Sequence, residues 1–131
     1  MKIRSETVHK IYEHCHGGYP FEVCGLLISD GNDIIDSYEV RNTTDGNKLT
    51  TYLIDPLDLI KGDDIAEERG LEVIGNYHSH PNHSSAPSET DRKSAVKNWI
   101  YAIIATNKSE IEMKFWKVEN GYLVEVAINQ G

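Results

Sequence analysis

Residues 71–91 read LEVIGNYHSHPNHSSAPSETD, and this stretch decides how the chain folds around its polar centre. The residue pattern of its first part, 71–77, predicts a strand that runs into His78. Alternate side chains of a strand point to one face, so His78 and His80 project together. Pro81 ends the strand, because proline cannot donate to a β-ladder. The segment therefore predicts two imidazoles side by side at a strand end.

A helix is predicted to follow from Ser88, in the sequence SETDRKSAVKNW of residues 88–99. Asp91 lies in its first turn, where the side chain is free to reach back toward the histidines. A more ordinary interpretation is also open, because a serine followed three residues later by an acid is close to a capping box. The apolar positions of this helix follow helical spacing: Ala95, Val96 and Trp99.

Two imidazoles and one carboxylate are the ligand set of a zinc site whose fourth position is left for water. Such a site is catalytic, because structural zinc sites are closed by four protein ligands. A pair of histidines one residue apart also occurs by chance on exposed strands, and a capping acid alone does not indicate a metal. Here the pair, the loop and the acid share one segment, and this conjunction favours a metal site.

The segment YPFEVCGLLIS, residues 19–29, places Glu22 just before an apolar run that is typical of a buried strand. A lone glutamate at such a position is most often a solvated loop acid. Beside a zinc site, however, a carboxylate that is not itself a ligand can take the proton of the attacking water. Glu22 is therefore the candidate general base.

Together these residues resemble the motif of the JAMM metallopeptidases, also called the MPN-plus domain. That motif has an upstream glutamate, a His-Ser/Thr-His-Pro run, and a serine and an aspartate at fixed spacing behind it. The segments 20–27 and 52–56 are also similar to the family, so that the resemblance covers nearly the whole chain. The matching residues are Glu22, His78, Ser79, His80, Pro81, Ser88 and Asp91.

The resemblance implies a role for each matching residue. His78, His80 and Asp91 would bind one zinc ion per chain. Glu22 would act as general base and then as proton donor to the leaving amine, and Ser88 would stabilise the oxyanion of the tetrahedral intermediate. The chemistry agrees, because zinc lowers the pKa of bound water to about 7 and polarises a carbonyl.

Length and composition indicate one globular domain, 1–131, without room for a separate substrate-binding domain. The net charge of −8 argues against nucleic acid as a partner and is consistent with a basic protein partner. No apolar run approaches a membrane span, and the first residues lack the apolar stretch of a signal peptide. We therefore expect a cytoplasmic protein that binds no membrane.

The remaining elements predict an α+β fold, a single mixed β-sheet flanked by helices, and the family resemblance implies a cytidine-deaminase-like layout. Ser5 is expected to cap a first helix that ends at Gly17–Gly18. Asp55–Pro56 has the signature of a second helix that runs towards Gly70, with Gly62 as a weak point in its middle. Further strands are expected at 23–29, 34–40, 101–106, 111–118 and 122–128.

Other polar residues receive ordinary interpretations. His14 and His16 lie two apart on a helix and cannot chelate one metal, so a role at the helix end is expected. His83 is expected to be a solvated loop residue, with a contact to substrate as the alternative. Cys15 and Cys24 form no Cys-x-x-Cys pair and are read as buried apolar residues without a disulfide.

Two other function classes share features with this sequence. A non-catalytic scaffold of MPN type is disfavoured because its members lack ligands that are present here. A zinc deaminase is excluded because its His-x-Glu and Pro-Cys-x-x-Cys signature is absent. The resemblance to small prokaryotic members, and the short stretch 42–51, favour a peptidase or isopeptidase. Its substrate would be a ubiquitin-like or sulfur-carrier protein, cut after a C-terminal Gly-Gly, with release of cysteine as one example.

Overall fold

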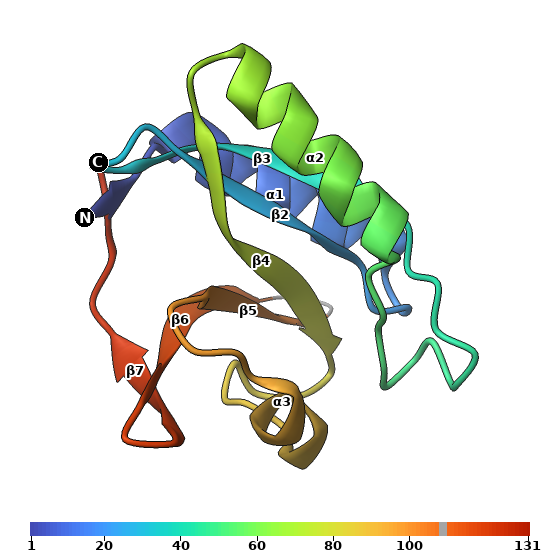
Figure 1. Ribbon diagram of the computed structural model, residues 1–131. Helices are drawn as coiled ribbons and strands as arrows, with labels where there is room; N and C mark the ends of the chain where they lie inside the picture. The colour runs from blue at the N-terminus through green and yellow to red at the C-terminus, as the bar shows by residue number, and fades with distance from the viewer. Residues whose placement is uncertain (108–109) are drawn as a thin grey trace.

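The computed structural model describes residues 1–107 and 110–131 and contains the helices and strands shown in Figure 1. The elements run in chain order as β1 (Lys2–Ile3), α1 (Ser5–Gly18), β2 (Cys24–Ser29), β3 (Ile34–Val40), α2 (Pro56–Glu68), β4 (Glu72–Pro81), α3 (Glu89–Ser94), β5 (Ile100–Thr106), β6 (Ile111–Glu119), β7 (Tyr122–Val126) and β8 (Asn129–Gln130).

The strands form one eight-stranded mixed sheet in the order β7-β6-β5-β4-β2-β3-β1-β8. β4 runs parallel to β5 and antiparallel to β2, and the sheet is strongly curled around this centre (Figure 1). The two termini lie side by side, because β1 pairs with β8 through Lys2 and Asn129. The predicted α+β class, with a single mixed sheet flanked by helices, is confirmed.

The helices α1 and α2 cover opposite faces of the sheet. On β2, Leu27 faces α1 and belongs to the main core, whereas its neighbour Leu26 faces α2 and contacts Gly62. On β4, Tyr77 points into the core under α1. The alternation of a strand therefore directs the next side chain, His78, to the α2 face, where the polar site lies.

The first helix begins at Ser5, whereas a cap at Ser5 would make it begin at Glu6. Arg4 occupies the cap position without a side-chain hydrogen bond, and Ser5 is already helical. The Ser5 hydroxyl instead donates to the carbonyl of Gly131, because the C-terminal strand lies beside it. The predicted capping role of Ser5 is wrong, whereas the predicted end of this helix at Gly17–Gly18 is confirmed.

The second helix has the predicted start. Asp55 is its cap and accepts a hydrogen bond from the Leu57 amide at 2.9 Å, with Pro56 in the first turn. Gly62 does not break the helix, which continues to Glu68. A Cβ at this position would stand 2.3 Å from Cδ1 of Leu26 on the sheet, so that Leu26 would have to move. The glycine therefore suits the contact between α2 and the sheet.

The third helix is shorter than its apolar periodicity predicts, because it ends at Ser94 and Ala95 is extended. The expected stripe of Ala95, Val96 and Trp99 does not form: Val96 is exposed, and the Trp99 indole turns toward β4. Tertiary hydrogen bonds decide this, since the Val96 amide donates to the Tyr101 hydroxyl at 2.7 Å.

The C-terminal hairpin forms as predicted and turns at Asn120–Gly121, where both residues have positive φ. Its second strand, β7, ends two residues earlier than expected, and the two-residue strands β1 and β8 were not predicted. Within the described part of the chain, no helix is long and apolar enough to cross a membrane. A cytoplasmic location stays a prediction.

Candidate metal centre

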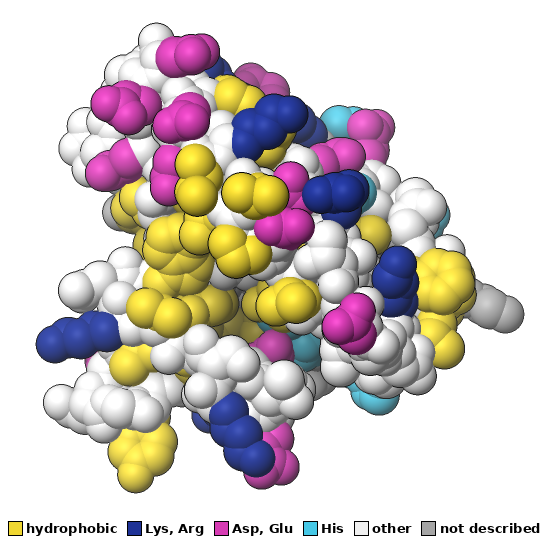
Figure 2. Space-filling view, turned by 45° about the vertical axis from the view of Figure 1, so that its right-hand side comes forward, with side chains coloured by type: hydrophobic (Ala, Val, Ile, Leu, Met, Phe, Trp, Pro, Cys, Tyr) yellow, Lys and Arg dark blue, Asp and Glu magenta, His cyan; other side chains and the backbone are white. Residues whose placement is uncertain are grey.

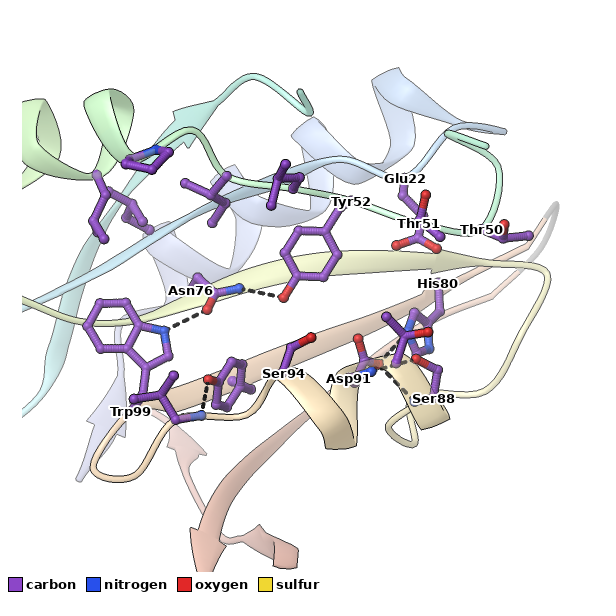
Figure 3. Close-up of a pocket in the computed structure, with 18 residues that line it drawn as sticks. Glu22, Thr50, Thr51, Tyr52, Asn76, His80, Ser88, Asp91, Ser94 and Trp99 are labelled. Atoms are coloured by element: carbon purple, nitrogen blue, oxygen red, sulfur yellow. Dashed lines mark hydrogen bonds and ion pairs between the residues drawn. The ribbon is translucent and has the colours of Figure 1, made fainter. Parts of the chain in front are cut away.

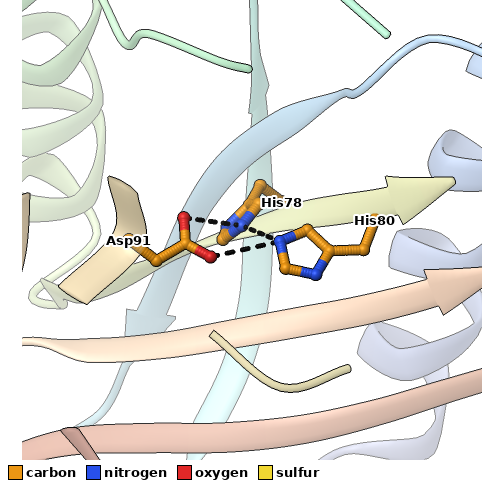
Figure 4. Close-up of side chains that lie close together, drawn as sticks. All are labelled: His78, His80 and Asp91. Carbon is orange, nitrogen blue, oxygen red and sulfur yellow. Dashed lines mark hydrogen bonds and ion pairs between the residues drawn. The ribbon is translucent and has the colours of Figure 1, made fainter. Parts of the chain in front are cut away.

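Three potential metal ligands converge at the end of β4. His78 and His80 project from this strand to one face, and Asp91 reaches back from the first turn of α3 (Figure 4). The two Nε2 atoms are 3.0 Å apart. The Asp91 carboxylate lies 3.2 Å from Nε2 of His78 and 3.1 Å from Nε2 of His80.

The spacing and protonation of these atoms fit a divalent metal. Ligand atoms around a tetrahedral zinc lie about 3.3 Å from one another, close to the three separations found here. Nδ1 of His80 lies 2.8 Å from the carbonyl of Ser84, which can only accept, so the proton of a neutral ring stands on Nδ1. The lone pair of Nε2 then faces the carboxylate. The Nε2 lone pair of His80 and the lone pairs of the Asp91 carboxylate repel each other unless a proton or a cation lies between them.

The electrostatics favour the ligand form of His78 and Asp91. Burial lowers the pKa of His78, so that its ring is neutral near neutral pH. Burial alone would raise the pKa of Asp91, but the two imidazoles beside it outweigh this effect and hold that pKa well below its usual range. A neutral imidazole and an ionised carboxylate are the states that bind metals.

Ser88 and Asp91 also form the capping box that was the more ordinary interpretation. The Ser88 hydroxyl oxygen accepts from the Asp91 amide at 3.0 Å, and Oδ2 of Asp91 accepts from the Ser88 amide at 2.8 Å. The capping box therefore occurs together with the approach of Asp91 to the two histidines. The cap orients the carboxylate toward the histidines, and the proton of the Ser88 hydroxyl is not used in the capping bond.

Glu22 is brought to the centre by strand register. Cys24 pairs with His78 across β2 and β4, so two residues earlier Glu22 reaches the level of His80. Ser79 fixes this alignment: its amide donates to the Val23 carbonyl and its hydroxyl accepts from the Val23 amide, both at 3.0 Å. The Glu22 side chain is only 6% exposed, and burial raises its pKa to about 7.

A groove of about 490 Å³ runs from these residues along the α2 face of the sheet. Glu22 and His80 line one end, on opposite sides, and Trp99 lines the other (Figure 3). Figure 2 shows a band of hydrophobic side chains on this face, with acidic side chains above it. Away from the metal centre, the groove is lined mostly by aliphatic and aromatic residues.

The sequence did not reveal three groove residues, Tyr52, Asn76 and Trp99. The Asn76 amide donates to the Tyr52 hydroxyl at 3.1 Å, and its carbonyl oxygen accepts from the Trp99 indole at 2.6 Å. Strand alternation could have indicated Asn76, because it precedes His78 by two residues and so shares its face. No local pattern could have indicated that Trp99 leaves the helix.

The loop between β4 and α3 is held by β6. The Ser85 hydroxyl donates to Glu112, and the Trp116 indole donates to the Ser85 carbonyl at 3.0 Å. His83 lies in the same loop and is exposed, in agreement with a solvated residue. The loop therefore has a fixed course between the ligands that flank it.

The histidines of α1 and Cys15 lie away from the centre, whereas Cys24 is the cross-strand neighbour of His78. The His14 ring contacts the Tyr77 hydroxyl at 2.6 Å, so the expected helix-end role is wrong for His14. His16 does lie in the last turn of α1. Cys15 and Cys24 are both buried and free, as expected.

The family model for prokaryotic homologues of the JAB domain matches residues 4–119. A desampylase of Haloferax volcanii is 34% identical over 103 residues, which are 76% of this chain and 73% of that protein. A CysO-cysteine peptidase of Mycobacterium tuberculosis is 24% identical and is matched over 98% of this chain and 90% of that protein. A probable TtuB-protein conjugate cleaving protease of Thermus thermophilus is 42% identical, over 45% of this chain and 40% of that protein.

Among solved structures, the JAB1/MPN domain protein AF2198 from Archaeoglobus fulgidus superposes with a TM-score of 0.63 at 22% identity. The match covers 99% of this chain and 100% of that one, and it supports the fold. Because the family model spans most of the chain and the fold agrees, the chain belongs to the prokaryotic homologues of the JAB domain and is a peptidase of the JAMM type.

Proposed function

We propose that the protein is a zinc-dependent peptidase that hydrolyses the bond after the C-terminal Gly-Gly of a ubiquitin-like or sulfur-carrier protein. The observation that carries the proposal is the convergence of His78, His80 and Asp91 beside a buried carboxylate, Glu22, in one groove. The relatives support the substrate class, since one is named a CysO-cysteine peptidase and another a TtuB-protein conjugate cleaving protease.

In this proposal His78, His80 and Asp91 hold one zinc ion. When bound, zinc would supply Lewis acidity toward the scissile carbonyl and the attacking water. Glu22 takes a proton from the water as the water's oxygen bonds to the carbonyl carbon. As the C–N bond breaks, Glu22 returns the proton to the leaving amine. A carboxyl group whose pKa is raised to about 7 by burial is suited to both transfers near neutral pH.

Ser88 stabilises the developing oxyanion. Its oxygen accepts the Asp91 amide hydrogen, which fixes the hydroxyl at the rim of the centre while its own proton is left for the substrate. A single donor of this kind contributes on the order of 3 kcal/mol to the transition state. The products are a carrier that ends in the Gly-Gly carboxylate and a free amine.

The groove supports an extended tail as the bound segment. The segment Thr50–Ile54, between β3 and α2, lines it without belonging to the sheet, and an extended tail could add to this segment as a strand. The two glycines of the carrier's tail, placed next to the metal centre, would let the scissile carbonyl approach without a side-chain clash. The carrier's folded body would then lie outside the groove, against its exposed apolar rim.

The test compares three substrates with the zinc-loaded protein: a carrier ending Gly-Gly-Cys, the same carrier ending Ala-Val-Cys, and casein. Mass spectrometry should detect release of cysteine from the first only. Glu22→Gln is the matched control, because the amide keeps the size of the side chain but cannot take a proton. Equal rates on all three substrates would indicate a broad peptidase. No cleavage of any substrate by the wild type would favour a non-catalytic scaffold.

A further inference from the structure

The two histidines of the metal centre are oriented in different ways. Nδ1 of His80 is fixed by the Ser84 carbonyl. Nδ1 of His78 is buried and has no hydrogen-bond partner among the described residues. A metal-binding imidazole is usually oriented by a hydrogen bond on its second nitrogen. Something else must therefore hold the His78 ring, which is only 1% exposed.

The ring of Tyr52 covers the face of His78. The two ring centroids are 4.2 Å apart and the planes are inclined by 20°, which is a stacked arrangement. Tyr52 belongs to the segment between β3 and α2, far in sequence from β4. Stacking restricts rotation of the imidazole about its Cβ–Cγ bond, because turning the ring would drive its edge into the tyrosine.

Tyr52 is itself fixed by Asn76 and Trp99 (Figure 3). The indole N–H can only donate, so the Asn76 carbonyl oxygen must face Trp99 and its NH₂ group must face the Tyr52 hydroxyl. Asn76 is 4% exposed, and both of its amide atoms have partners. The three side chains therefore form a continuous support from one wall of the groove to the other.

We propose that Tyr52 is a positioning residue whose ring holds the His78 imidazole in the orientation that binds zinc, with a smaller contribution from Asn76 and Trp99, which fix the Tyr52 hydroxyl. This inference rests on the zinc site of the proposed function. The ring of Tyr52 orients His78 by stacking on it, whereas the Ser84 carbonyl orients His80 by a hydrogen bond. The ring is therefore needed more than the hydroxyl, because it is the ring that meets His78.

The test measures zinc affinity of metal-free protein by competition with a chromophoric chelator. Tyr52→Leu and Tyr52→Met fill the space without a flat ring, and each should bind zinc about tenfold to a hundredfold more weakly, as for loss of other supports of metal ligands. Tyr52→Phe keeps the ring and should stay within about threefold of wild type, well below that cost. Tyr122→Leu, at an exposed tyrosine of β7, is the control and should not change the affinity.

The absorption spectrum of the cobalt(II)-substituted protein provides a second readout, because it reports the ligand geometry. It should change in Tyr52→Leu and be preserved in Tyr52→Phe. Thermal melting of the metal-free variants identifies those that fold, and one folded variant of the Leu and Met pair is enough. Wild-type affinity and spectrum in that variant would overturn the inference and leave the proposed function intact. A wild type that binds no zinc would overturn both.

Discussion

At the residue scale, His80 connects the loop to the metal centre. Its Nδ1 bonds the Ser84 carbonyl, and its Nε2 meets the Asp91 carboxylate. We predict that His80→Ala loses the stoichiometric zinc of the wild type, because two remaining ligands hold this metal poorly. Elemental analysis of the purified proteins measures this. The control is His83→Ala, at an exposed histidine of the same loop, which should keep its zinc. Full zinc content in His80→Ala would show that the ligand set is wrong.

Ser88 has a capping role and a proposed catalytic role, and these can be separated. Ser88→Ala removes the acceptor of the Asp91 amide and should destabilise the fold by about 1 kcal/mol, as for other caps. It should also lower kcat by about a hundredfold to a thousandfold through loss of the oxyanion donor. Lys93→Ala, at an exposed residue of α3 that does not line the groove, is the control for both measurements. A stability loss without a loss of kcat would leave Ser88 with the capping role alone.

The residues of the centre differ in how far sequence could predict them. Strand alternation was enough to place His78 and His80 on one face, and a capping pattern was enough to place Asp91 in a first turn. Glu22 was less certain, because its position beside His80 depends on the pairing of β2 with β4. Tyr52 could not be predicted as a contact of His78, since no local pattern joins a loop residue to a strand so far along the chain.

At the element scale, the close packing of α2 on the sheet gives a paired prediction about glycines. Gly62→Ala and Gly17→Ala both replace a helical glycine, and each gains up to about 1 kcal/mol of helix propensity. At Gly17 nothing lies within 4 Å of the new Cβ, so this gain should be realised. At Gly62 the Cβ meets Leu26, and overpacking should cost about 1–3 kcal/mol.

Urea unfolding of the two variants measures the difference. Gly17→Ala should be more stable than wild type, and Gly62→Ala should be less stable than Gly17→Ala. Because Leu26 also lines the groove, a displaced Leu26 should reduce the activity of Gly62→Ala. Equal stability of the two variants would mean that α2 shifts away from the sheet without cost.

The elements that sequence predicted well are those with a strong local signal. Asp55 and Pro56 start α2 by a cap and a fixed φ, and β2 is a continuous apolar run buried throughout. α3 was predicted too long because helical periodicity competes with the hydrogen bonds of Val96 and Trp99, which form only in the folded protein. β1 and β8 have two residues each, too few for any periodicity.

At the scale of the whole molecule, Asp36 of β3 links two helical regions. Lys10 of α1 lies 3.0 Å from its carboxylate, and Arg69, which follows α2, lies 2.8 Å from it. Burial alone would raise the pKa of Asp36, but these two hydrogen bonds outweigh it and the pKa is lowered. The folded state therefore favours the ionised form. This stabilisation is present above the ordinary aspartate pKa of about 3.9 and is lost as the pH falls through the lower folded value.

Asp36→Asn should accordingly be less stable than wild type at neutral pH, by about 1 kcal/mol or less, because the pairs are partly exposed. The difference should begin to shrink as the pH falls below about 4, where Asp36 of the unfolded chain becomes protonated, and it should be lost once the pH lies below the lower pKa of the folded state. Urea unfolding at several pH values measures it. Asp63→Asn, at an exposed residue of α2, controls for the change in net charge. A difference that is independent of pH would exclude the ionised carboxylate as its source.

In the proposed function, the substrate meets the molecule along the groove. Leu53, from the segment before α2, and Val96, from the segment after α3, both line the groove and are 54% and 60% exposed, an arrangement that suits contact with a carrier's apolar surface. Leu53→Asp and Val96→Asp should each lower kcat/KM for a folded carrier ending Gly-Gly-Cys by about tenfold or more, as for other buried apolar contacts of an interface.

Zinc content and melting temperature should stay unchanged in both variants, because neither residue touches the metal centre. Tyr122→Asp places the same charge at an exposed apolar residue of β7, away from the groove, and should leave kcat/KM unchanged. A short peptide ending Gly-Gly-Cys separates the two parts of the substrate, since it presents a tail without a folded body. If Leu53 and Val96 bind the folded body of the carrier, Leu53→Asp and Val96→Asp should slow cleavage of the peptide less than cleavage of the carrier. Equal losses on both substrates would mean that these residues contact the tail.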